Sequence, residues 1–313
     1  MPFEPVILFF ILGLLAGIIR SDLKIPGVLY ESVSIFLLLA IGLKGGIELA
    51  KVPLASIAGP ALIVVFAAAI IPLLAFPVLH RIGRLARADA ASIAAHYGSV
   101  SVVTFAVAAS YLLRLDEPAE AYMVVFLVLL EFPALVLGVV LARRGHGDTR
   151  WAHLLHEVFS GKSIVLLVGG LLIGWIAGTD GIKPLDRLFL DLFKGMLAFF
   201  LLEMGLVVAS RLADLRRAGA FLIAFAVVMP VLAGGLGVIT ANVIGLSVGG
   251  AAMLATLYAS ASYIAAPAAM RIAIPEANPA LSIGAALGVT FPFNLLIGIP
   301  LYYGMAVRFD GVL

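Results

Sequence analysis

Long apolar runs alternate with short polar breaks along the whole chain. The runs are about 15 to 25 residues long, which suits helices that cross the hydrocarbon core of a bilayer. The breaks carry charges and turn formers, as in "RSDLKIPG" at 20–27 and "GTDGIKPLDR" at 178–187. The first and sixth runs are short and would need flanking residues to reach across. The pattern predicts ten spans, at 6–19, 32–50, 57–79, 90–112, 120–141, 164–178, 190–209, 218–242, 250–271 and 281–306.

Composition decides between a soluble protein and a membrane protein. Of the 313 residues, 63% are hydrophobic and 12% are charged, against about 25% charged in an ordinary soluble domain. We therefore predict an all-α polytopic membrane protein in a lipid bilayer. The net charge of +2 is too small to indicate a nucleic-acid partner. The absence of cysteine excludes disulfides and thiolate metal sites.

Lysine and arginine predict the orientation of the spans, because cytoplasmic loops carry an excess of both. Thirteen of these residues lie at breaks that follow odd-numbered spans, and six lie toward the opposite side of the membrane. We therefore expect the odd-numbered breaks in the cytoplasm, both termini outside, and a place in a bacterial inner membrane. No basic residue precedes the first run, so we interpret 6–19 as a retained span and not as a signal peptide.

The two halves of the chain resemble each other at an almost constant offset. "GSVS" at 98–101 matches "ASAS" at 259–262, and "EFPALVLG" at 131–138 loosely matches "TFPFNLLIG" at 290–298. Five spans in each half would turn the second copy upside down in the membrane. Inverted repeats are typical of secondary transporters, whose substrate lies near the midplane at the repeat interface. Further matches at offsets of 157 or 158 pair Gly13 with Gly170, Gly17 with Gly174, and Pro26 with Pro184.

These matches divide the chain into three parts. We expect a first five-helix repeat at 1–142, a cytoplasmic connection at 143–163, and a second five-helix repeat at 164–313. Small and polar residues interrupt one apolar run in each repeat, in "AHYGSVSVVTF" at 95–105 and in "ASASYIAAP" at 259–267. Irregular backbone is tolerated in a membrane only where it is buried in protein or lines a cavity. Spans four and nine are therefore expected to be discontinuous helices.

The two interruptions are candidates for an anion site. A helix that restarts after residues 97–98 would offer free N–H groups at Ser99, Val100 and Ser101, which carry the positive end of the helix dipole. The second interruption would approach from the other side, and no arginine or lysine stands near either one, which argues against a large carboxylate. The alternative is that small residues only allow close helix packing. The candidate anion-binding residues are Gly98, Ser99, Val100, Ser101, Thr104, Ala259, Ser260, Ala261, Ser262 and Tyr263.

Some ionisable residues lie inside the spans, where each costs a few kcal/mol on insertion scales. Lys44 and Glu48 stand four residues apart on one helix face and could neutralise each other. Glu203 could pair with Lys44, because its segment is the repeat copy of the Lys44 segment. We interpret this pairing as structural.

Glu131 differs from these residues because it precedes Pro133 in a span next to the first serine cluster. Its copy region carries Thr290 and Asn294, which also offer oxygen atoms. Hard cations such as sodium take oxygen ligands, including carbonyls released where a helix is broken. One interpretation is a sodium site built from Glu131, Thr290 and Asn294, and the other is plain hydrogen bonding between helices.

His96 adjoins the first serine cluster. We interpret it as a hydrogen-bonded packing residue, although a proton carrier or a neighbour of the substrate would also fit. Ser99 and His96 together admit a membrane-embedded hydrolase. Against that reading, no G-x-S-x-G elbow and no nearby acid supports a nucleophile. We therefore expect no enzyme activity and no cofactor apart from a coupling ion.

These features together resemble one known family. The chain resembles the sodium-dependent bicarbonate transporters, the SbtA-type permeases best known from cyanobacteria. The resemblance rests on the ten spans in two repeats, on "AHYGSVSVVTF" in the first repeat, and on "YASASYIAAPAAMRIAIPEANPALSIGAALGVTFPFNLLIGIPLYY" at 258–303 in the second. The resemblance covers almost the whole chain. It implies an electrogenic symporter of sodium and bicarbonate, a homotrimer, and a core domain that moves against a scaffold domain like an elevator.

The resemblance also assigns parts of the chain. It places bicarbonate at the broken helices near 98–101 and 259–262. Spans three to five and eight to ten would form the core, and spans one, two, six and seven the scaffold and trimer contacts. Cyanobacterial members have a longer central connection that is implicated with a PII-like regulator, so the short stretch at 143–162 argues against carrying over that partner. A sodium- or proton-coupled symporter for another small anion remains the alternative function.

Overall fold

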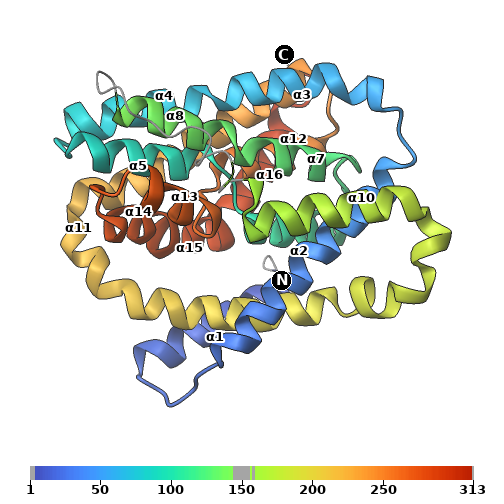
Figure 1. The fold of residues 1–313 in the computed structure, drawn as a ribbon, viewed down its shortest axis with the longest axis horizontal. Helices are drawn as coiled ribbons and strands as arrows, with labels where there is room; N and C mark the ends of the chain where they lie inside the picture. The colour runs from blue at the N-terminus through green and yellow to red at the C-terminus, as the bar shows by residue number, and fades with distance from the viewer. Residues whose placement is uncertain (1–3, 144–155, 157–158, 312–313) are drawn as a thin grey trace.

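The structure is a computed structural model that describes residues 4–143, 156 and 159–311. Every regular element in this part of the chain is helical (Figure 1). The longer helices are α1 (Pro5–Ile18), α2 (Gly27–Leu49), α3 (Leu54–Ala68), α4 (Ile70–Pro77), α5 (Arg87–Gly98), α6 (Val102–Arg114), α7 (Met123–Glu131), α8 (Pro133–Ala142), α10 (Lys162–Ile182), α11 (Phe193–Val243), α12 (Val248–Ala259), α13 (Ala265–Ala273), α14 (Pro279–Ala285) and α16 (Ile299–Phe309). The short helical turns are η1 (Val78–Ile82), η2 (Lys183–Leu185), η3 (Arg187–Asp191), η4 (Ala286–Thr290), α15 (Phe291–Phe293) and η5 (Asn294–Gly298).

Helix lengths confirm an all-helical polytopic fold. The predicted first and ninth spans correspond to shorter helices, Pro5–Ile18 and Val248–Ala259, so the number ten stays a prediction. The predicted sixth span is longer than expected but kinks at Gly178, where φ is +60°. Eight helical stretches of the described chain are long and apolar enough to cross a membrane, namely Gly27–Leu49, Leu54–Ile82, Arg87–Arg114, Met123–Ala142, Lys162–Leu185, Arg187–Arg211, Gly219–Val243 and Pro279–Phe309.

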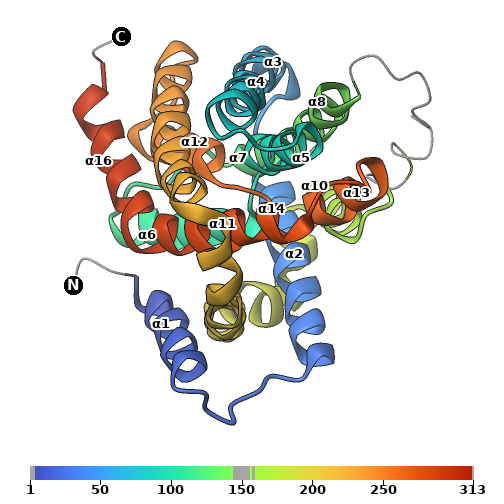
Figure 2. The same cartoon turned by 90° about the vertical axis from the view of Figure 1, so that its left-hand side faces the viewer.

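Two close helix pairs form one side of the molecule, α1 against the first part of α11 and α2 against α10 (Figures 1 and 2). Glycines allow the backbones to approach. A side chain at Gly13 would collide with the carbonyl oxygen of Leu202, and one at Gly174 would collide with that of Leu43. Small residues at such contacts let membrane helices gain van der Waals packing. We call this side the glycine-packed side.

The helix α11 connects the two sides of the molecule. It is 51 residues long and bends at Gly219, whose φ of +81° and ψ of 159° are non-helical and suit glycine because it has no Cβ. After the bend, α11 packs against α12, where Gly237 approaches the backbone of Ala255, and against Tyr302 of α16. One helix therefore contributes to both the glycine-packed side and the opposite side, which also holds α4, α5 and α8.

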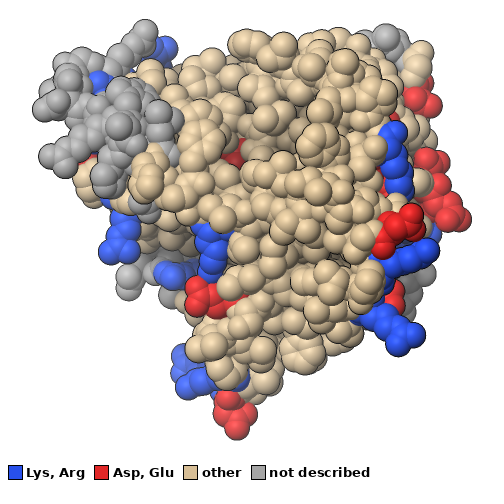
Figure 3. Space-filling view, turned by 45° about the vertical axis from the view of Figure 1, so that its right-hand side comes forward, with Lys and Arg blue, Asp and Glu red and all other residues tan. Residues whose placement is uncertain are grey.

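The outer surface is largely apolar. Phe66 is 72% exposed and Ile176 is 80% exposed, and Figure 3 shows a broad uncharged area with lysine, arginine, aspartate and glutamate toward its margins. Exposure of so much apolar surface to water is unfavourable, whereas contact of the same surface with lipid chains carries no such cost. The surface therefore agrees with the membrane-spanning helix lengths.

Candidate functional site

Both predicted helix interruptions are present in the structure. The helix α5 ends at Gly98 and α6 begins at Val102, so that residues 99–101 are not helical. The helix α12 ends at Ala259 and α13 begins at Ala265. We call residues 99–101 the first break and residues 260–264 the second break. Spans four and nine are thus discontinuous, as predicted.

The two breaks contact each other directly. The backbone N–H of Ser101 donates to Ser260 Oγ over 2.9 Å, although the two residues are 159 positions apart. The backbone N–H of Ser262 donates to the carbonyl oxygen of His96 over 2.8 Å. All four residues are buried. Two stretches that are distant in the sequence therefore face each other, as the sequence predicted.

The positions of the free donors differ from the prediction. We expected free N–H groups at Ser99, Val100 and Ser101. Ser99 N–H donates to the carbonyl oxygen of Ala95 at 3.2 Å and Ser101 N–H donates to Ser260, whereas no hydrogen bond in the described chain uses the N–H of Val100. The reason is that the new helix starts later than expected. The helix α6 begins with Val102 and Val103. The N–H groups of these two residues have no acceptor within α6, because the first N–H groups of any helix lack one.

The first turn of α6 is capped in a way that leaves those two donors available. Ser101 Oγ accepts the backbone N–H of Thr104 at 3.2 Å and the Thr104 hydroxyl at 2.9 Å. This is N-capping by serine, which satisfies the third N–H of the helix and not the first two. The N–H groups of Val102 and Val103 therefore carry the positive end of α6.

A small cavity adjoins these donors. Its volume is about 70 Å³, and Val102 and Val103 line it together with Ile264 of the second break. The opposite wall comes from α2, α10 and α11, including Tyr30, Ser34, Lys162 and Phe200. A space of this size holds only a few water-sized groups. The cavity thus offers a small ligand the positive end of one helix and several polar side chains.

The four serines of the breaks already have partners in this conformation. Ser99 Oγ donates to the carbonyl oxygen of Glu131 at 3.4 Å, and Ser260 Oγ donates to that of Leu257 at 2.7 Å. Ser262 Oγ accepts the N–H of Ala266 at 3.1 Å. None of the four is among the described residues that line the small cavity. Of the four hydroxyls, that of Ser260 joins the second break to the first, and the other three bond to residues within or beside their own break.

The remaining candidate anion residues surround the breaks. Gly98 ends α5 where a side chain would press on Ala134 and Pro72, and Val100 and Ala261 are buried within the breaks. The hydroxyl of Tyr263 is buried without a hydrogen-bond partner among the described residues. The structure therefore gathers the candidate anion residues into one buried region.

The candidate cation ligands flank this region separately. Glu131 is 2% exposed, and its Oε2 is buried without a hydrogen-bond partner in the described chain. Asn294 donates to the carbonyl oxygen of Ala259 at 2.9 Å and accepts the hydroxyl of Tyr302 at 2.7 Å. Glu131 thus touches the first break through Ser99, and Asn294 touches the end of α12 before the second break.

Thr290 makes contacts between helices. Its hydroxyl donates to the carbonyl oxygen of Ala226 at 2.7 Å and lies 2.7 Å from the hydroxyl of Tyr97. Within the described residues, no hydrogen bond joins Glu131 to Thr290 or Asn294, and no group of three or more acidic or histidine residues is arranged to hold a metal. Hydrogen bonding between helices therefore accounts for the Thr290 and Asn294 contacts seen here.

The other charged residues of the spans pair differently from the prediction. Glu48 forms an ion pair with Lys51 at 2.7 Å, and within the described chain no ion pair joins Lys44 to Glu48 or Glu203. Lys51 is the better partner because it lies at the exposed end of α2 and needs no desolvation. Lys44 and Glu48 both line a cavity of about 560 Å³ between α2, α6 and α7.

His96 has a structural environment. It is fully buried, and its Nδ1 lies 2.7 Å from the carbonyl oxygen of Ser92. A carbonyl only accepts, so Nδ1 carries the proton. In the described chain, His96 Nε2 has no hydrogen-bond partner and no contact joins it to the Ser99 hydroxyl. The geometry gives no support to a serine–histidine nucleophile.

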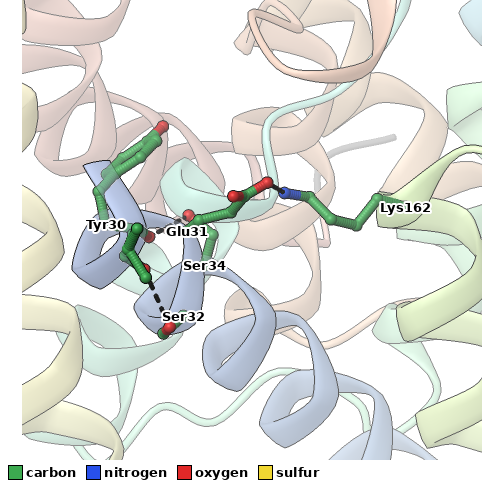
Figure 4. Close-up of polar contacts among 6 residues, drawn as sticks. Tyr30, Glu31, Ser32, Ser34 and Lys162 are labelled. Atoms are coloured by element: carbon green, nitrogen blue, oxygen red, sulfur yellow. Dashed lines mark hydrogen bonds and ion pairs between the residues drawn. The ribbon is translucent and has the colours of Figure 1, made fainter.

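Sequence reasoning missed one charged residue near the breaks. Lys162 begins α10 and lines the small cavity, whereas we expected no lysine or arginine there. Figure 4 shows Lys162 reaching across to the first turns of α2, where Tyr30, Glu31, Ser32 and Ser34 lie. Lys162 is 60 or more residues from each break in the sequence, so proximity along the chain could not reveal it. The polar run "YESVS" at 30–34 in an apolar span was the available signal.

Two larger cavities adjoin the small one. The cavity of about 560 Å³ shares the lining residues Ile41 and Ala106 with it. A cavity of about 420 Å³ shares Lys162 and Ile264 with it and continues along α10 and α13. The three cavities therefore form a series, with the small cavity between the two large ones.

Comparison with known proteins then connects this arrangement to a family. A comparison with curated proteins finds no match to the chain. A family model, described as the Na+-dependent bicarbonate transporter superfamily, matches residues 5–307. The match takes in both helix breaks and all the candidate residues around them. The chain therefore belongs to the Na+-dependent bicarbonate transporter superfamily.

Proposed function

We propose that the protein is a symporter that imports bicarbonate together with sodium across the cytoplasmic membrane by elevator-type alternating access. The observation that carries this proposal is the contact of the two helix breaks beside a small cavity. Broken helices at the repeat interface are where secondary transporters bind substrates. Family membership supports sodium and bicarbonate as the transported ions.

The anion site is proposed at the first turn of α6. Bicarbonate has three oxygen atoms that accept hydrogen bonds, and the N–H groups of Val102 and Val103 are donors at a positive helix end. The serines of the breaks fix the backbone that presents those donors, because Ser101 caps α6 and Ser260 holds Ser101. The other residues of the breaks would enclose the anion when the domains move.

Sodium is proposed as the coupling ion for an electrical reason. A membrane potential that is negative inside drives an anion outward with about 2.3 kcal/mol per charge per 100 mV. Import of bicarbonate therefore needs a co-transported cation. Glu131 offers a buried carboxylate oxygen without a partner in the described chain, and its backbone carbonyl accepts the hydroxyl of Ser99 in the first break. Asn294 and Thr290 complete the proposed site only if their present hydrogen bonds rearrange.

An elevator movement needs two bodies, and the packing supports a division. The proposed scaffold contains the predicted spans one, two, six and seven, which make up the glycine-packed side. In it, Gly13 and its repeat counterpart Gly170 come from different halves of the chain, and each approaches a backbone carbonyl of the facing helix, that of Leu202 and that of Leu39, which supports the inverted repeat. The proposed core contains spans three to five and eight to ten. The small cavity has lining residues from both bodies, as a transport path between them requires.

Orientation and assembly complete the proposal. The basic residues favour both termini outside a bacterial inner membrane, and the family resemblance favours a homotrimer. Residues 144–155 and 157–158 of the connection at 143–163 lie outside the described residues, and the PII-like regulator stays a prediction that the short connection argues against. The chain has no cysteine, so a Gly147→Cys variant gives a clean test of orientation. Labelling of that cysteine by an impermeant reagent added outside the cell would contradict the proposed orientation.

The direct test of function is uptake into proteoliposomes. Purified protein is expected to accumulate labelled bicarbonate when an inward sodium gradient is present and to stop when choline replaces sodium. A proton gradient without sodium separates sodium coupling from proton coupling. Competition by other small anions separates bicarbonate from the alternative substrates. Equal uptake with and without sodium would contradict the proposal.

A further inference from the structure

Lys162 stands at the junction of two cavities. It lines the cavity of about 70 Å³ beside the first break, and it also lines the cavity of about 420 Å³. Among the described residues around these two cavities, Lys162 has the one charged side chain. A small anion in either cavity would therefore share a lining residue that carries a positive charge.

The present partner of Lys162 does not belong to either cavity. Lys162 Nζ lies 2.7 Å from Glu31 Oε1 (Figure 4), and the two side chains are 44% and 62% exposed. Glu31 is not among the described lining residues of the two cavities. Ion pairs this exposed contribute little, because water screens them and the side chains lose freedom. Lys162 can therefore leave Glu31 at small cost.

The wall opposite Lys162 is also suited to an anion. Val102 and Val103 present the positive end of α6 on that wall, and Ile264 belongs to the second break. An anion in the small cavity would lie between this helix end and the ammonium group. Two positive groups on facing walls attract an anion more strongly than either alone, since few water molecules fit between them.

We propose that Lys162 is an anion-contacting residue of the transport path and that it exchanges Glu31 for the transported anion when the anion occupies the small cavity. This inference rests on the proposed function, because it concerns the same path. Its consequence is that Glu31 competes with bicarbonate for Lys162. The strength of the Lys162–Glu31 ion pair then influences the affinity of the small cavity for the anion.

The test compares single charge removals at the two partners. Lys162→Gln is expected to weaken bicarbonate binding by about tenfold, because the ammonium group is lost. Glu31→Gln is expected to tighten binding, because Lys162 loses the carboxylate that competes with the anion. Lys183→Gln is the matched control, since Lys183 follows the other end of α10 and forms a similar exposed pair with Asp180. Calorimetric titration with bicarbonate in sodium buffer measures all three.

An exchange of the two charges separates anion contact from structural pairing. The double variant Glu31→Lys with Lys162→Glu keeps an ion pair but moves the positive charge away from the cavities. An anion contact predicts that this variant binds as weakly as Lys162→Gln, and that Lys162→Arg retains most of the affinity. Restored binding in the double variant, or equal losses in Glu31→Gln and Lys162→Gln, would overturn the inference. If Lys162→Gln keeps sodium-dependent uptake with the bicarbonate affinity of the wild type, the role of Lys162 is refuted but the proposed function stands. If the wild-type protein shows no sodium-dependent uptake of bicarbonate, the proposed function itself is refuted.

Discussion

The two helix breaks have similar sequences but unequal surroundings. At the first break, Ser101 caps α6 through Thr104, and the two preceding residues of the helix, Val102 and Val103, line the small cavity. At the second break, Ile264 precedes α13 without a side-chain cap, and Ser262 Oγ accepts an N–H of the second helical residue. The first break therefore presents donors to a cavity, and the second presents fewer.

The second break instead supports the first. Its Ser260 hydroxyl accepts the N–H of Ser101, and its Ser262 N–H donates to the carbonyl oxygen of His96. These two bonds satisfy backbone groups that would otherwise be buried without partners, which is costly inside a membrane protein. Matching sequence in two repeats thus does not mean matching roles. In this conformation the second break supports the backbone of the first, where we propose the anion site.

The largest expected effect comes from removing a donor at the first break. Val102→Pro removes one N–H from the first position of α6, where proline is tolerated. The extended backbone of Ser101, with φ −113° and ψ 112°, also suits a residue before proline. A hydrogen bond to a charged group contributes about 1.5–3 kcal/mol, so bicarbonate affinity should fall about ten- to a hundredfold in calorimetry.

A matched control for this variant is Val248→Pro. Val248 is the first residue of α12, whose preceding Ser247 is also extended and also caps its helix. Binding should stay near the wild-type value in this control. Equal losses in both variants, or undiminished binding in a well-folded Val102→Pro protein, would show that the donors of α6 are not the anion site.

The next effect concerns the support given by the second break. Ser260→Ala removes the acceptor of the buried Ser101 N–H, and an unpaired buried donor costs about 1–3 kcal/mol. The free energy of unfolding in detergent should fall by that amount. Ser99→Ala should cost much less, because the Ser99 hydroxyl makes a long contact of 3.4 Å. Comparable losses in the two variants would contradict the supporting role of the second break.

A smaller effect is expected at the proposed cation ligand. Glu131→Gln keeps the shape of the side chain but removes the carboxylate of a residue whose backbone carbonyl contacts Ser99 of the first break. The sodium concentration for half-maximal uptake should rise by about tenfold, corresponding to about 1.4 kcal/mol. Glu203→Gln makes the same change in another span and should leave the sodium dependence as it is. A Glu131→Gln protein with wild-type sodium dependence would remove this residue from the proposed site.

Much of this arrangement could be predicted from the sequence because membrane helices leave strong local patterns. Apolar runs predicted the helical spans, and small polar residues at 98–101 and 259–262 predicted both breaks and their contact. The glycines that match between halves, such as Gly13 and Gly170, lie at close helix contacts.

The rest depended on packing that no local pattern carries. The helix α6 begins at Val102, later than we expected, because Ser101 caps the helix with its side chain and donates its backbone N–H to Ser260. Lys162 could not be assigned to the site, because only the packing of α10 against α2 brings it to the small cavity. The pairing of Glu48 with Lys51 rather than Lys44 likewise reflects which side chains reach the exposed helix end.

The central claim is that an anion at the first break and a sodium ion beside it bind together. If one ion strengthens binding of the other, linkage requires the reverse effect to the same degree. Calorimetry on purified protein can measure bicarbonate binding in sodium and in choline buffers, and sodium binding with and without bicarbonate. The account predicts that each ion lowers the dissociation constant of the other by the same factor. Bicarbonate binding of equal strength in sodium and in choline would contradict it.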